Sequence, residues 1–342
     1  MEPTERKMKI LEAVVEAYIK TGDPIGSKAV CEVLDFNVSS ATVRNDMAEL
    51  SNLGLLAQPH TSSGRIPTEL GYRIYIDDLM KPVTLNRHEK AAIKDMLELH
   101  ADTPEELLDT AAGILSRVTG YAAAATSPPG EHALIRHVRF VQTGRYTAMA
   151  VLITSLGSVK PKLFRCDYQI TPSLLEMFDK AVNERLAGMS VLAVTPAFVQ
   201  TTALSLGEMS MMMPNVLLAV SEAAKEASAD GIAIKGQSSL FTMPELEAAC
   251  GKKVMELLGH SREFSKLMTT AASGTGVLIG SELPNPAFSS LSIAAVPYTA
   301  APDCVGTLAV IGPLRMNYPK TKATLECVTD LVGASLSELL EL

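Results

Sequence analysis

Two adjacent side chains, Arg44 and Asn45, have the chemistry needed to read the edge of a base pair in DNA. An arginine can donate two parallel hydrogen bonds to guanine O6 and N7, which is worth about 1–3 kcal/mol of discrimination against a wrong base. Asn45 can bond adenine or guanine, or only the backbone or water. The alternative for Arg44 is a solvated ion pair with a nearby acid. The surrounding pattern favours base contact for Arg44 and leaves Asn45 open.

Hydroxyl groups lie close to this pair in the segment SSATVRNDMAEL (39–50). Ser40 and Thr42 suit phosphate oxygens, and a phosphate contact sets register without reading sequence. Ser40 has an alternative role, because either Ser39 or Ser40 can cap a helix by accepting a bond from its first-turn amides. The segment therefore predicts a helix whose first turns carry the polar residues.

A second polar cluster follows, and its small hydroxyls and turn amides also suit phosphate oxygens. Its residues are His60, Thr61, Ser62, Ser63, Gly64 and Arg65. Gly64 is expected to permit the positive φ of a tight turn, and Arg65 can hold a phosphate or enter the minor groove. An ordinary polar hairpin is the alternative. Further along the chain, the sequence does not decide whether Arg73 contacts DNA or has another role. Tyr72 is expected in the core.

Three short helices must position these residues. Residues 5–20 carry apolar side chains at the helical period and stop at Thr21–Gly22. The second helix, 27–34, is expected to bury Ala29, Val30, Val33 and Leu34. The third ends at Gly54, and its inner face is expected to hold Val43, Met47, Leu50 and Leu53. Three such helices, the last with a polar outer face, predict a helix-turn-helix whose last helix enters the major groove.

A small hairpin and another helix follow the third helix. Residues 55–58 and 65–66 predict two short strands joined by the SSGR turn, which makes the hairpin a wing. The next helix, 68–80, is broken by Pro82. Residues 1–82 therefore predict a winged helix-turn-helix.

Composition limits the class of protein. The 342 residues carry a net charge of −8, and residues 1–81 hold 9 Lys and Arg against 12 Asp and Glu. This balance argues against nonspecific coating of nucleic acid, so the basic groups must point one way and the acids another. Five scattered cysteines and the lack of a signal peptide or apolar span indicate reduced thiols in a cytosol, and no membrane contact.

The rest of the chain predicts an α+β domain interrupted by an insertion. Two helices, 88–100 and 104–120, precede the clearest boundary signal, TSPPG at 126–130. Three strands are expected at 134–143, 146–155 and 159–168, and three more at 277–279, 291–297 and 306–312. The helical stretches between them are 173–187, 213–229 and 244–269, with a short strand at 232–234. A last helix at 319–341 closes the chain.

Several motifs resemble the heat-inducible transcription repressors of the HrcA family. They are TGDPIGSKAV (21–30), SSATVRNDMAEL (39–50), LGLLAQPHTSSGRIPT (53–68), GYRIYID (71–77) and VGTLAVIGPLRMNY (305–318). The resemblance implies an N-terminal winged helix-turn-helix (1–82), a helical connector (83–127) and a discontinuous GAF-like α+β domain (128–169 and 271–342). An inserted dimerisation domain (170–270) completes the expected fold.

The resemblance also implies a function. Family members are bacterial, cytoplasmic repressors that associate with the nucleoid when bound. They bind an inverted-repeat, CIRCE-type operator of chaperone genes as homodimers, and a GroEL-type chaperonin keeps them active until heat diverts it. The expected contacts to double-stranded DNA are Ser40, Thr42, Arg44, Asn45, His60, Thr61, Ser62, Ser63, Arg65 and Arg73.

The sequence also bears on whether the protein is an enzyme or binds a cofactor. Gly274, Gly276 and Gly280 do not form a dinucleotide fingerprint, because the third glycine comes one residue late and a strand follows. Without a catalytic or metal motif, neither an enzyme nor a cofactor is expected. Two alternatives stay open for the α+β domain: a module gated by a small ligand, and a plain dimerisation module. If the chaperonin link fails, marginal stability of the protein itself is the alternative thermosensor.

Overall fold

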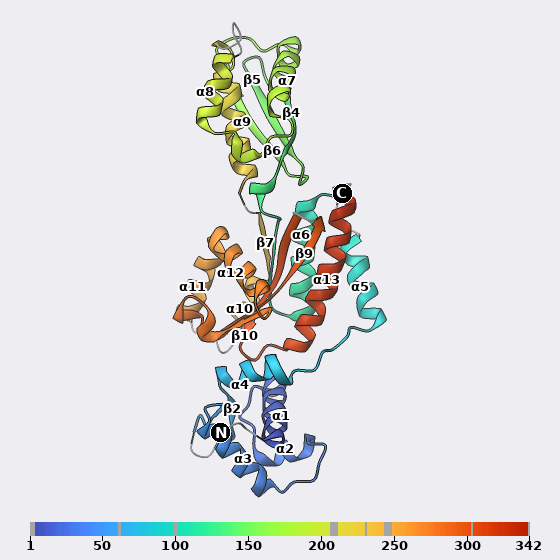
Figure 1. Cartoon of the computed structure of the whole chain (residues 1–342), viewed down its shortest axis with the longest axis vertical. Helices are drawn as coiled ribbons and strands as arrows, with labels where there is room; N and C mark the ends of the chain where they lie inside the picture. Colours follow the sequence, from blue (N-terminus) through green and yellow to red (C-terminus); the bar gives the residue numbers. More distant parts are fainter. Residues whose placement is uncertain are drawn as a thin grey trace.

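Three parts follow one another along the long axis of the molecule (Figure 1). The computed structural model describes residues 4–60, 63–98, 102–205, 211–229, 231–242, 248–301 and 304–340. The N-terminal part lies at one end, the central part is built on a five-stranded sheet, and the outer part at the other end is built on a three-stranded sheet. We use these three names below.

The N-terminal part contains the predicted helices and wing. Its elements are α1 (Glu5–Thr21), α2 (Ser27–Val33), α3 (Ser40–Asn52), β1 (Leu56–Ala57), β2 (Ile66–Pro67), α4 (Glu69–Ile74) and the π-helical turn η1 (Tyr75–Leu79). Gly22 ends α1 in the left-handed conformation, with φ 74°, and its N–H bonds the Tyr18 carbonyl. The predicted helix at 68–80 is found as α4 and η1, and the chain turns extended at Met80.

The core between these helices differs in part from the expected one. Val30, Val43 and Leu50 are fully buried, as predicted. The prediction is wrong for Ala29, which is exposed, and for Val33, whose exposed fraction is 63%. Because α2 has only two turns, only a few of its side chains can face α1 and α3, and the side chains of Ala29 and Val33 do not. Leu53 is also 39% exposed, because it follows the last residue of α3.

The central sheet has the strand order β7-β3-β10-β9-β8, and all its pairs are antiparallel. Its strands are β3 (Ala122–Thr126), β7 (Ile232–Lys235), β8 (Val277–Ile279), β9 (Leu291–Ala301) and β10 (Cys304–Pro313). One face packs on α6 (Pro104–Thr119) and α13 (Tyr318–Leu339), and α5 (Arg87–Glu98) lies outside them. The other face packs on α10 (Gln237–Leu240) and α12 (Ser261–Ser273), with α11 (Ala248–Gly259) beside α12.

Strand β3 has no counterpart in the predicted elements. Its sequence, AAAAT, lacks the β-branched and aromatic residues typical of strands, yet all five residues are buried. Alanines at 123 and 125 face the core under α6 and α13, while those at 122 and 124 face the core under α12. Tertiary packing on both faces therefore overrides the weak strand propensity of alanine.

The outer part is a separate layer of sheet and helices. Its three-stranded antiparallel sheet, β4-β5-β6, packs on α7 and α9, and α8 lies against α9. The elements are β4 (Ile135–Gln142), β5 (Thr147–Thr154), β6 (Val159–Arg165), α7 (Pro172–Leu186), α8 (Pro196–Ser205) and α9 (Pro214–Ala227). The aromatic rings of Phe140, Phe164 and Phe178 meet inside it at centroid distances of 5.9 and 6.1 Å.

The structure groups the strands differently from the expected domain bounds. Residues 128–169 were expected to join 271–342, but β4, β5 and β6 pair only with one another among the described strands. The chain leaves the central sheet after Thr126 and returns at Ile232. Ser127 N–H donates to Gly231 O at 2.8 Å, and Gly231 N–H donates to Ser127 Oγ at 2.8 Å. Helix α12, expected in the insertion, packs on the central sheet instead, and α11 lies beside it.

The N-terminal and central parts share one apolar core. Tyr72 and Tyr75 are buried there, and the rings of Tyr72 and Tyr318 lie 6.2 Å apart. Burial raises the pKa of the Tyr75 and Tyr318 hydroxyls far above their ordinary value. No helix within the described ranges is both long and apolar enough to cross a bilayer.

Candidate nucleic-acid interface

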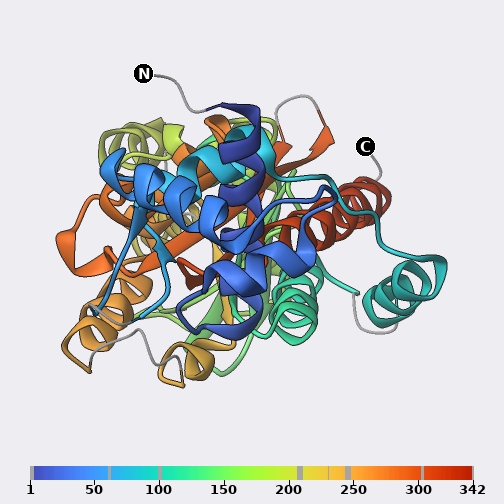
Figure 2. The same ribbon diagram turned by 90° about the horizontal axis from the view of Figure 1, so that it is seen from below.

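Helix α3 lies at the end of the molecule that faces away from the central part (Figure 1). Figure 2 looks at that end and shows the N-terminal helices in front of the rest. Ser39 caps α3, because its Oγ accepts the Thr42 N–H at 3.1 Å. The Ser40 hydroxyl instead lies 2.9 Å from the Ser27 hydroxyl, which ties α3 to the start of α2. The cap is therefore Ser39, and Ser40 connects two helices.

Arg44 and Asn45 are exposed in the first two turns of α3. Neither side chain has a hydrogen bond or ion pair with any described residue. The ion pair weighed as the alternative for Arg44 is therefore not formed in this part of the chain. An unpaired guanidinium beside an unpaired amide, on the outer face of such a helix, matches the donors that read guanine and adenine in the major groove.

The acids of α3 point toward α1. Asp46 is 3% exposed and accepts two hydrogen bonds from Arg6, at 2.9 Å from Nε and 3.0 Å from Nη2. The hydrogen bond to Asp46, and then the charge of that carboxylate, raise the pKa of the Arg6 guanidinium. Glu49 pairs with Lys7. Both acids of α3 are thus paired with basic residues of α1, Asp46 inside the protein and Glu49 at its surface, and neither pairs with Arg44.

The wing is a short hairpin whose turn bonds itself. Its register pairs Leu56 with Pro67 and Ala57 with Ile66. The Ser63 hydroxyl donates to His60 O at 2.6 Å and accepts the His60 N–H at 2.9 Å. Gln58 Nε2 donates to Ser63 O at 3.2 Å. The expected contacts Thr61 and Ser62 lie outside the described residues.

Gly64 is required for a different reason from the expected one. It is not among the described glycines with positive φ. A Cβ at Gly64 would lie 2.4 Å from Ile25 O, because the wing passes directly over the loop between α1 and α2. Ile25 and Arg65 exchange both backbone hydrogen bonds there, each at 2.8 Å. The glycine therefore permits a close backbone approach that fixes the wing beside α3.

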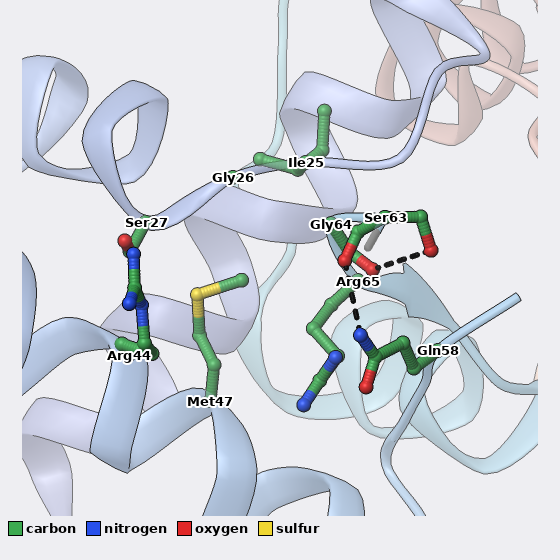
Figure 3. Close-up of a pocket in the computed structure, with 9 residues that line it drawn as sticks. All are labelled: Ile25, Gly26, Ser27, Arg44, Met47, Gln58, Ser63, Gly64 and Arg65. Carbon is green, nitrogen blue, oxygen red and sulfur yellow. Dashed lines mark hydrogen bonds between the residues drawn. The ribbon is translucent and has the colours of Figure 1, made fainter. Parts of the chain in front are cut away.

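A groove of about 420 Å³ separates α3 from the wing (Figure 3). Arg44 and Arg65 lie on its two sides, and Met47 lies between them. The Nε of Arg65 is buried and has no hydrogen-bond partner among the described residues. The groove is lined by Ile25, Gly26, Ser27, Arg44, Met47, Gln58, Ser63, Gly64 and Arg65. Two separated cations above a concave, polar surface suit a phosphate backbone passing between them.

Gln58 and Ser27 are groove residues outside the set expected from sequence. Gln58 could be found from its position just before the hairpin turn, on the strand opposite Arg65. Ser27 carries no local signal, because its contact with Ser40 joins two different helices. Thr42 lies at the start of α3, where its hydroxyl is 2.8 Å from that of Ser39.

The structure does not bring Arg73 to this surface. Its side chain is 19% exposed, and its guanidinium bonds Thr275 and Val277 of the central part. The physical reason is the direction of α4, whose Arg73 side points toward β8 and away from α3. Arg73 is therefore separated from the other expected DNA contacts.

Comparisons with known proteins agree with this geometry. The model "Winged helix-turn-helix transcription repressor, HrcA DNA-binding" matches residues 2–78, and "HrcA protein C terminal domain" matches residues 105–321. A heat-inducible transcription repressor HrcA from Acetivibrio thermocellus is 30% identical, with 97% of this chain and 98% of that protein covered. The one from Laribacter hongkongensis is 31% identical, with 97% and 96% covered.

A solved structure shares the whole arrangement of elements. It is described as the crystal structure of a hypothetical protein, and it superposes with a TM-score of 0.70. The two sequences are 22% identical, and 99% of each chain is covered. This likeness extends over all three parts and concerns the fold alone.

Proposed function

Because the chain belongs to the HrcA family of heat-inducible transcription repressors, we propose that it represses chaperone operons by binding an inverted-repeat, CIRCE-type operator. Helix α3 enters the major groove, and the wing lies against the backbone. One observation carries the proposal: Arg44 and Asn45 bond no described residue on the outer face of α3, while Asp46 and Glu49 are held by α1.

We assign different tasks to the two sides of the groove. Arg44 and Asn45 read bases, while Thr42 and Ser40 contact phosphate at the start of α3. On the wing, Arg65 holds a phosphate. His60, Ser63 and the two wing residues outside the described ranges, Thr61 and Ser62, are proposed as further backbone contacts. Gln58 joins this set because it lines the groove beside Arg65.

We propose that the outer part is the dimerisation domain and the central part the GAF-like domain. One helix reads only a half-site, so an inverted repeat needs a two-fold protein. The sheet of the outer part packs α7 and α9 on one face only. The opposite face is mostly apolar, although His137, Arg139 and Arg165 also lie on it. Its apolar side chains belong to Val141, Met149, Val151, Ile153, Val159, Pro161 and Leu163. Leu163 and Val159 are 69% and 50% exposed in the single chain, which supports a second copy as the partner of this face.

The GroEL-type chaperonin remains a proposed partner on the strength of the family resemblance. Gating by a small ligand, the alternative, has weaker support. The space between α12 and the central sheet is filled by apolar side chains that include Phe264, Met268, Ile293 and Ile311. Measuring operator affinity against temperature, with and without chaperonin, tests the link. Equal affinities with and without it would remove the chaperonin and leave the protein's own stability as thermosensor.

Footprinting on the organism's own chaperone promoters tests the proposed function directly. The full-length protein is expected to protect a two-fold symmetric site, and Arg44→Ala is expected to lose that protection. Lys94→Ala is a matched control, because Lys94 lies on α5, in another part of the molecule, and its one ion pair among the described residues is with the exposed Glu98. Protection of no symmetric site at any chaperone promoter would contradict the proposal.

A further inference from the structure

Helix α4 joins the N-terminal part to the central part through two charged side chains, Glu69 and Arg73. They lie four residues apart, and therefore on one side of the helix. Glu69 Oε2 accepts the Ser281 N–H at 3.0 Å. Gly280 has φ +47°, and a Cβ there would lie 2.4 Å from the carboxyl carbon of Glu69. The glycine therefore lets this carboxylate approach the backbone of the central part closely.

Arg73 makes the second half of the contact. Nη1 donates to Thr275 Oγ1 at 3.0 Å, and Nη2 donates to Val277 O at 3.2 Å. Nε lies 3.2 Å from Oε1 of Glu282, whose other oxygen accepts the Ile279 N–H at 2.9 Å. Glu282 thus holds the guanidinium and the end of β8 together. We call this set of contacts the latch; its residues are Glu69, Arg73, Thr275, Val277, Ser281 and Glu282.

The latch gives a structural role to two glycines, Gly276 and Gly280, whose spacing does not fit a dinucleotide-binding motif. Gly276 and Gly280, with φ 80° and 47°, flank strand β8 at the two turns that present Thr275 and Ser281 to α4. The Tyr72 and Tyr318 rings pack beside these polar bonds. Bonds in several directions, next to a packed core, resist both rotation and sliding of α4 on the central part.

The latch does not cover the DNA-facing surface. Helix α3 lies at the end of the N-terminal part that faces away from the central part (Figure 1). The latch can therefore be closed while the groove with Arg44 and Arg65 is open. The latch therefore acts on function by setting the direction in which α3 points. It does not change the accessibility of α3.

We propose that the latch sets the distance and angle between the two reading helices of the dimer, so that Arg73 and Glu282 are positioning residues for operator spacing. This inference rests on the proposed function. The outer part, the proposed dimer contact, lies at the opposite end of the long axis from α3 (Figure 1). A rotation at the latch therefore turns α3 relative to the proposed dimer contact, and so changes its distance and angle to α3 of the second copy. Only a stiff joint holds two half-sites at one spacing with a high effective concentration.

The test measures affinity against half-site spacing for the full-length protein. Selection from a random duplex pool with the wild-type chain first defines its half-site and natural spacing. A series of duplexes then lengthens or shortens the spacer one base pair at a time. Wild-type affinity is expected to fall at least about tenfold away from the natural spacing, because the second half-site is no longer reached in register.

Arg73→Met and Glu282→Gln open the latch from its two sides. Both are expected to bind the natural spacing about tenfold more weakly and the altered spacings nearly equally, which flattens the profile. Binding to a single half-site is expected to be unchanged. Asp77→Asn is the matched control, because Asp77 contacts Arg73 at 3.5 Å from within the same helical segment and touches no latch residue of the central part.

Each outcome decides the inference. If both latch variants show the same dependence of affinity on half-site spacing as the wild-type protein, the inference is wrong. Equal loss on the single half-site would also overturn it, because the variants would then damage the reading helix itself. Recovery of no inverted repeat by the wild-type chain would refute the proposed function and the inference together. Thermal unfolding of each variant confirms that the protein used in the titrations is folded.

Discussion

Arg44 and Arg73 lie on opposite sides of the N-terminal part and have opposite surroundings. Arg44 is exposed and bonds no described residue, whereas Arg73 is largely buried, donates hydrogen bonds to Thr275 and Val277, and forms an ion pair with Glu282. Both are arginines in segments that resemble the same family. The difference teaches that a motif assigns an arginine to a domain, while its partners decide whether the guanidinium is available to a ligand.

The largest expected effect is that of Arg44→Ala on operator affinity. Loss of a bidentate guanine contact costs about 1–3 kcal/mol at each half-site, so two half-sites cost about 2–6 kcal/mol. Titrations on operator and scrambled duplexes check this. Equal losses of affinity on both duplexes would show that Arg44 does not read bases. The contrast between Arg44, available to DNA, and Arg73, held within the protein, would then fail.

Arg73→Ala is expected to act on stability. Removal of hydrogen bonds to a charged, largely buried group costs about 1.5–3 kcal/mol, whereas Arg44→Ala, at an exposed site that bonds no described residue, stays within about 0.5 kcal/mol. Denaturant unfolding of the two variants measures both values. Similar free energies of unfolding for the two would contradict the distinction drawn between them.

Arg65→Ala is expected to have a smaller and less selective effect. A lost phosphate contact weakens binding to all sequences alike and reduces the salt slope by about 0.9 for each half-site. Titrations at several salt concentrations, on specific and scrambled duplexes, give both quantities. An unchanged salt slope would place Arg65 away from the backbone.

The last comparison concerns the pairs that hold the acids of α3, where the expected difference is between two stabilities and does not involve DNA. Arg6→Ala is expected to lower the Tm more than Lys7→Ala, because the Asp46 side chain is 4% exposed and the Glu49 side chain 57%. Solvent replaces the partner of Glu49 but cannot reach Asp46. Calorimetry of the two variants compares them directly. A larger loss for Lys7→Ala would reverse the assigned order.

Much of the N-terminal part could be predicted from sequence. The amphipathic period of α1, the stop at Gly22 and the turn between the wing strands are local patterns, and the structure has all three. The need for Gly64 was expected at the right residue for the wrong reason, because its neighbour Ile25 lies far away in the chain. The place of Arg73 could not be predicted, since its partners lie 202 and 204 residues further on.

The sequence by itself therefore determined the helices, the wing and the family, because caps, turns and helical periods depend on residues a few positions apart. Only the tertiary structure decided which charged side chains are paired within the protein and which are left exposed. It buried Asp46 against Arg6, closed the latch on Arg73, and placed the alanine strand β3 in the middle of a sheet. Each of these depends on contacts between distant segments, and the free energy of such contacts outweighs local propensity.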